Sequence, residues 1–94
     1  MIETTEAAYS TQTRAALRYI PKSFQPGPDA GPQTVAEELA DRIEVLQYVE
    51  GLIRLPGQEE WISHAWCKTP DDTIVDPYCL NKYPDSWREI EYCE

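Results

Sequence analysis

The sequence of 94 residues has few of the side chains that usually mark a chemical site, with one histidine and three cysteines. An odd number of thiols without a short paired spacing is a poor disulfide framework and lacks the Cys-x-x-Cys element of many zinc sites. One histidine with three thiolates, here His64, Cys67, Cys79 and Cys93, is still a possible zinc set. His64 and Cys67 point to opposite faces of one predicted strand, however, so we expect neither a metal nor a cofactor.

Long apolar runs are also missing. No stretch approaches the roughly 20 apolar residues that a membrane helix needs, so no membrane partner is expected. The first residues, MIETTEAAYS, have neither the basic start nor the apolar run of a signal peptide. These absences predict a cytoplasmic protein with reduced thiols.

Basic residues are scarce, with 8 Lys and Arg against 17 Asp and Glu, and the net charge is −9. Residues 34–60 carry two basic against seven acidic side chains and residues 61–94 carry three against seven, whereas residues 1–33 are neutral. Such a surface repels nucleic acid and anionic membranes. It favours a protein partner with a basic surface, although acidity also simply keeps small proteins soluble.

The clearest predicted element is a helix over residues 34–47, TVAEELADRIEVLQ. Thr34 followed by Glu37 has the spacing of a capping box, in which the hydroxyl and the carboxylate bind backbone N–H groups reciprocally. One apolar stripe follows at helical spacing, formed by Val35, Leu39, Ile43 and Leu46.

Strand patterns fill most of the remainder. Residues 48–55, YVEGLIRL, alternate in polarity, and EWISHAWCK and TIVDP flank the turn TPDD as a hairpin. The stretch PYCLNKYPDS is predicted to be a loop, and WREIEYC a last strand. The order predicts an α+β fold with one main helix packed on a three- to four-stranded antiparallel sheet.

The first third of the chain has no clear helix or strand pattern. Residues 4–20 fit either a weak helix or an extended arm, and residues 21–33 form a connector rich in proline and glycine. We therefore divide the chain into an N-terminal arm and connector, 1–33, and an α+β domain, 34–94.

The stretch WISHAWC contains the only histidine. On a strand, His64 and Trp66 share one face, and Asp76 on the partner strand comes within reach of the imidazole. A carboxylate beside an imidazole fixes its tautomer, as in the base-and-orienter part of a nucleophilic triad. The alternative is a half-buried core histidine bonded to a neighbour.

These motifs resemble a group of small phage and bacterial proteins with a papain-like or transglutaminase-like core. The matching positions, within residues 32–80, are Tyr48, Glu50, Gly51, His64, Ala65, Trp66, Val75, Asp76 and Pro77. The resemblance implies a reduced papain-like core and gives His64 and Asp76 as catalytic positions, with Trp66, Glu50 and Tyr48 as binding residues. Its pattern places a cysteine after a glutamine at the start of the helix. Here Gln33 is followed by Thr34, so the nucleophile position holds an alcohol.

An alcohol does not ionise at neutral pH as a thiol beside an imidazole does. The resemblance therefore implies a non-catalytic, phage-encoded binding protein that inhibits or modulates a host protein, such as a defence protein with a basic surface. An alternative is a Cys/His-dependent amidase, peptidase or acyl transferase, for which Cys79 is the one credible nucleophile. A second alternative is a structural or accessory protein in which His64 belongs to the core and Thr34 is only a helix cap.

Overall fold

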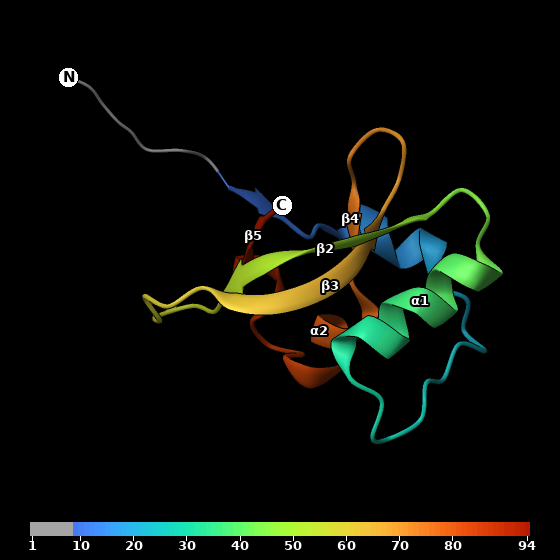
Figure 1. The fold of residues 1–94 in the computed structure, drawn as a ribbon, viewed down its shortest axis with the longest axis horizontal. Coiled ribbons are helices and arrows are strands. Elements are labelled where there is room, and N and C mark those ends of the chain that lie inside the picture. Colours follow the sequence, from blue (N-terminus) through green and yellow to red (C-terminus); the bar gives the residue numbers. More distant parts are fainter. Residues whose placement is uncertain (1–8) are drawn as a thin grey trace.

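The structure, a computed structural model, describes residues 9–94. Its main feature is a five-stranded antiparallel sheet with the strand order β1-β5-β2-β3-β4, and helix α1 lies across it beside α2 (Figure 1). The elements in chain order are β1 (Ser10–Thr11), η1 (Arg14–Tyr19), α1 (Pro32–Arg42), β2 (Gln47–Arg54), β3 (Ile62–Lys68), β4 (Ile74–Val75), α2 (Pro77–Lys82), η2 (Trp87–Glu89) and β5 (Glu91–Cys93). The predicted α+β class is confirmed.

The centre of the sheet is the long antiparallel pair of β2 and β3. In its register Gly51 lies opposite His64, and Val49 lies opposite Trp66. The β3–β4 hairpin predicted around the turn TPDD is present, and Asp72 in that turn has a positive φ of 67°. Strand β5 pairs with the other edge of β2, so the C-terminal residues lie close to the middle of the sheet.

Helix α1 begins two residues before the predicted start and ends at Arg42. Its N-cap is Gly31 and no side chain caps it, so the capping box predicted at Thr34 and Glu37 is wrong. Proline suits the first position of a helix because no N–H partner is needed there, and Pro32 therefore sets the earlier start. Leu46 is still buried, but it belongs to the turn that leads into β2.

The stretch after β4 is a helix rather than the predicted loop. Asp76 caps α2, its carboxylate accepting a hydrogen bond from the backbone N–H of Cys79 at 3.2 Å, and Pro77 stands at the first helical position. The sequence carried this Asp-Pro start signal. The predicted last strand, 87–93, divides into the short helix η2 and the three residues of β5.

Part of the predicted N-terminal element, residues 4–8, lies outside the described residues. Within 9–20 the chain forms β1, which pairs with β5, and then the 3₁₀ helix η1. Ala16 of this helix and Phe24 of the connector are buried together with α1, so residues before 34 contribute to the same core.

Two clusters of buried side chains stabilise the fold, and they contain opposite faces of β3. Ala65 and Cys67 belong to the cluster that includes α1 residues such as Leu39. Trp66 belongs to the second cluster, with Tyr92 at a ring distance of 4.9 Å. The alternation predicted for β3 is therefore confirmed. Among the described residues, no helix has the length and apolar character needed to cross a membrane.

Candidate functional site

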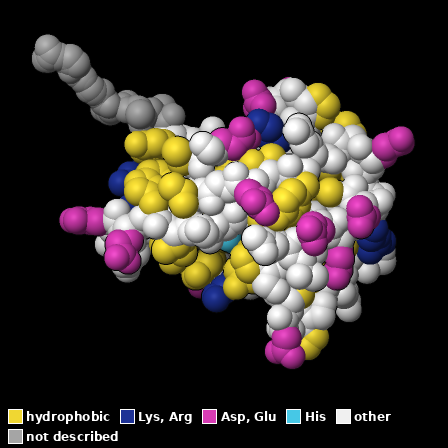
Figure 2. Space-filling view, in the orientation of Figure 1, with side chains coloured by type: hydrophobic (Ala, Val, Ile, Leu, Met, Phe, Trp, Pro, Cys, Tyr) yellow, Lys and Arg dark blue, Asp and Glu magenta, His cyan; other side chains and the backbone are white. Residues whose placement is uncertain are grey.

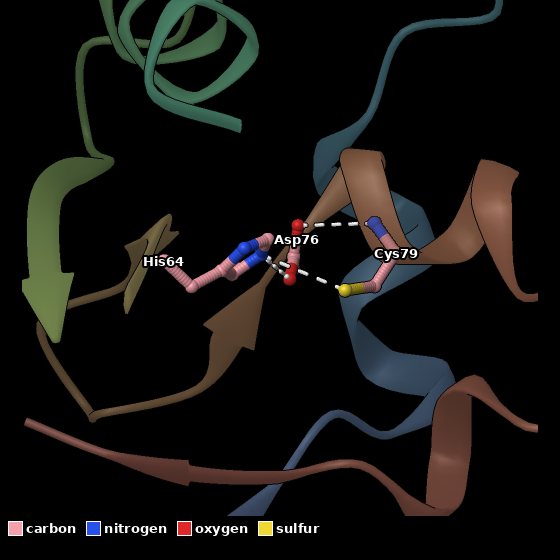
Figure 3. Close-up of side chains that lie close together, drawn as sticks. All are labelled: His64, Asp76 and Cys79. Carbon is pink, nitrogen blue, oxygen red and sulfur yellow. Dashed lines mark hydrogen bonds and ion pairs between the residues drawn. The ribbon is translucent and has the colours of Figure 1, made fainter. Parts of the chain in front are cut away.

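The imidazole of His64 projects from β3 toward the start of α2 (Figure 3). Its Nε2 lies 2.8 Å from Oδ2 of Asp76, and the two side chains are 3% and 1% exposed. The proximity expected from WISHAWC and TIVDP is thus confirmed. Asp76 holds its place because it ends the β3–β4 hairpin and at the same time caps α2.

Two further groups bind the carboxylate of Asp76, and a third binds its backbone. The Tyr92 hydroxyl donates to the same Oδ2 at 2.6 Å, and the Cys79 backbone N–H donates to Oδ1. The Asp76 backbone N–H donates to Oε1 of Gln12 at 2.6 Å, which ties the N-terminal segment to the site. No local sequence pattern points to Tyr92 or Gln12, because only the long-range placement of β5 and β1 brings them here.

His64 also lines a cleft of about 450 Å³ between the start of α1 and the strands β2 and β3. The chain has one histidine, and its cyan side chain is visible inside a hollow on the face shown in Figure 2. The cleft is also lined by Pro32, Thr34, Glu50, Leu52 and Ser63. None of the hydrogen bonds among the described residues uses Nδ1 of His64, so this nitrogen is available to a ligand.

Thr34 lies in the first turn of α1 with its side chain exposed, and it lines the same cleft as His64. No hydrogen bond joins the two within the described part of the chain. A group bound in the cleft can therefore contact both side chains. The site thus combines an imidazole bound to a buried carboxylate with an alcohol in the first turn of α1.

The floor of the cleft depends on Gly51. A Cβ at this position would lie 2.5 Å from the carbonyl oxygen of Cys93 and 2.6 Å from Cη2 of Trp66. Trp66 is 2% exposed and packs below the cleft rather than on its surface. Because Trp66 lies in the core, it offers no exposed surface to a ligand, and its predicted binding role has no support in the structure.

The predicted binding residues Glu50 and Tyr48 lie together on β2. The Tyr48 hydroxyl donates to Oε2 of Glu50 at 2.8 Å. Partial burial, this hydrogen bond and the charges of Glu50 and Glu37 raise the pKa of Tyr48 to about 12. Glu50 also lines the cleft, so one wall carries negative charge.

The thiols are poorly placed for nucleophilic chemistry. Cys79 Sγ lies 3.5 Å from His64 Nε2, which is the nitrogen already bonded to Asp76. A triad uses the two imidazole nitrogens separately, one for the orienting carboxylate and one for the nucleophile. Cys79 is fully buried, and burial and the charge of Asp76 raise the pKa of its thiol. Cys67 donates to the Ala36 carbonyl at 3.1 Å, and burial raises its pKa to about 12.

Comparisons with known proteins add no family to this picture. No protein-family model matches the chain, and neither curated proteins nor solved structures match it significantly. The papain-like resemblance therefore stays a prediction that rests on the quoted residues.

Proposed function

We propose that this chain is a small non-catalytic binding protein that holds a segment of a partner protein in the cleft beside His64. One observation carries the proposal. His64 and Asp76 are in hydrogen-bonding contact, yet among the described residues no thiol lines the cleft beside His64. The residue at the expected nucleophile position is Thr34.

The chemistry of that alcohol supports binding over turnover. A hydroxyl needs a base that removes its proton during attack, and Thr34 has no hydrogen bond to His64 within the described residues. Cys79, the nucleophile of the enzyme alternative, is enclosed and shares Nε2 with the carboxylate. A substrate in the cleft would not reach its sulfur.

The cleft favours a peptide with a basic side chain. Glu50 contributes negative charge, while the backbone N–H groups of Gln33 and Thr34 in the first helical turn contribute donors for a carbonyl oxygen. Leu52 is 40% exposed and adds an apolar wall. The net charge of −9 steers the chain toward a basic surface before contact.

The resemblance to phage and bacterial proteins extends the proposal to a biological setting. A phage-encoded acidic protein of this size is suited to inhibit or modulate a host protein in the cytoplasm, including a defence protein whose basic surface normally binds nucleic acid. The resemblance and the net charge of −9 support this setting.

A displayed library of random peptides tests the binding role without a known partner. Thr34→Trp fills the cleft mouth, and Asp41→Trp places the same ring on an exposed part of α1 that does not line the cleft. We expect lysine- and arginine-rich peptides to bind the wild type and Asp41→Trp, with affinity at least about tenfold weaker for Thr34→Trp. Because steering is electrostatic, the affinity should also fall as salt rises.

Two results would count against the proposal. Peptides that bind all three proteins equally would place recognition outside the cleft. A wild type that selects no peptide would favour the structural alternative, in which His64 serves only the core.

A further inference from the structure

Three potential metal ligands of different chemistry converge below the cleft. They are Nε2 of His64, the carboxylate of Asp76 and Sγ of Cys79, whose donor atoms all lie within 4.8 Å of one another (Figure 3). All three residues are buried. We propose that they form a binding site for one Zn²⁺ ion.

The spacing of the donor atoms fits tetrahedral zinc. Bond lengths of about 2.05 Å to nitrogen and about 2.3 Å to sulfur, at a tetrahedral angle, place the two donors about 3.5 Å apart. The observed distance between His64 Nε2 and Cys79 Sγ is 3.5 Å. The distance from Nε2 to Asp76 Oδ2 is 2.8 Å, so this pair must open by roughly half an ångström as the ion replaces their hydrogen bond.

The donor set also selects the metal. Imidazole and thiolate ligands suit zinc, whereas calcium and magnesium prefer oxygen donors alone. Binding requires Cys79 to lose its thiol proton to solvent. It also requires the neutral imidazole to carry its proton on Nδ1, so that the lone pair of Nε2 can bind the ion. One thiolate and one carboxylate then balance the two positive charges of the ion, which leaves the buried site neutral.

The chain holds the ligands from several elements. Asp76 and Cys79 form a compact Asp-x-x-Cys chelate at the start of α2, and His64 enters from β3. Tyr92 donates to the Asp76 carboxylate and Gln12 fixes its backbone, which are the outer-shell contacts that orient metal ligands. Nε2 of Gln12 is buried without a hydrogen-bond partner among the described residues, and a water near the site would satisfy it.

The cleft reaches His64 but is not lined by Asp76 or Cys79, so the ion enters only when the His64 side chain moves aside. A water that accompanies the ion can supply the fourth ligand. The zinc proposal goes beyond the binding function and does not depend on it, since the proposed peptide contacts lie on the cleft surface. Failure of one experiment leaves the other informative.

Cobalt titration tests the site. Co²⁺ in zinc-type sites with a thiolate ligand shows sulfur-to-cobalt charge-transfer absorption in the near ultraviolet. We expect chelator-treated protein to develop this band at one Co²⁺ per chain and to lose it when Zn²⁺ is added. Zn²⁺ should also raise the melting temperature in a concentration-dependent way.

Cysteine variants show which thiol binds the cobalt ion. The double variant Cys67→Ala, Cys93→Ser leaves Cys79 as the one thiol and should retain the band, while Cys79→Ser should lose it. A folded wild type without the band overturns the proposal. Loss of the band in a double variant that circular dichroism shows to be folded also overturns it, and this result does not require Cys79→Ser to fold.

Discussion

Replacing Asp76 by asparagine is expected to lower the free energy of unfolding by about 2–4 kcal/mol. The carboxylate accepts hydrogen bonds from Tyr92 and the Cys79 backbone and pairs with His64, all in a buried setting. An amide has one oxygen, so at least one of these partners must face its NH₂ group. A buried donor left without an acceptor destabilises the folded state by the full free energy of its desolvation.

Asp72→Asn provides the matched control, since it makes the same chemical change at a side chain that is 80% exposed and 3.3 Å from Lys68. Asparagine tolerates the positive φ at this turn, so the control should stay within about 0.5 kcal/mol of the wild type. Urea unfolding in the presence of a chelator measures both and excludes any metal contribution. If the two variants lost the same stability, the buried network would not be what stabilises this end of the sheet.

Gly51→Ala is expected to lower the free energy of unfolding by about 2–3 kcal/mol. The added Cβ would come within 2.6 Å of the Cys93 carbonyl oxygen and the Trp66 ring, and 3.1 Å from Cα of Glu94. A backbone oxygen cannot rotate away as a side chain does. The C-terminal strand must therefore move off β2, and the packing of Trp66 below the cleft must change with it.

Gly27→Ala is the control for the glycine itself. No atom lies within 4 Å of a Cβ built at Gly27, and its φ is not positive. There the smaller entropy of the unfolded chain should stabilise the protein by about 0.4–1 kcal/mol. Opposite signs at the two positions are the expected urea-unfolding result. A Gly51→Ala protein as stable as the wild type would mean that β5 does not pack closely against this part of β2.

Local patterns predicted much of the fold. The alternation of residues 48–55 predicted the strand β2, and the turn chemistry after Lys68 predicted the β3–β4 hairpin. Helix ends were less predictable, because Pro32 offered an earlier start than the apparent capping box. The loop predicted after Asp76 is a helix, since an N-cap aspartate followed by proline was interpreted only as the end of a strand.

The candidate site was predictable only where its residues are close in sequence. His64 and Asp76 flank one hairpin, so strand alternation and turn length bring them together. Tyr92 and Gln12 reach Asp76 from the two ends of the described chain, through strand pairings that no local pattern specifies. The approach of Cys79 to His64 depends on α2, where a loop was predicted.

The position of Thr34 as the replaced nucleophile is tested most directly by the alkylation rate of Thr34→Cys with iodoacetamide across pH. A Cys93→Ser background removes the one native cysteine that is not fully buried, and Asp41→Cys supplies an exposed thiol on the same helix. Adding His64→Gln separates the effect of the imidazole on the thiol pKa from the effect of the helix N-terminus, which also lowers it. Circular dichroism would confirm that each variant is folded.

We expect Thr34→Cys to react about five to ten times faster than Asp41→Cys at pH 7, because its pKa falls about one unit or more below the ordinary 8.5. His64→Gln should abolish most of that advantage. Equal rates at the two positions, or an advantage that is unchanged without His64, would contradict the account. Thr34 would then be an ordinary surface residue, and the His64–Asp76 pair would serve the core alone.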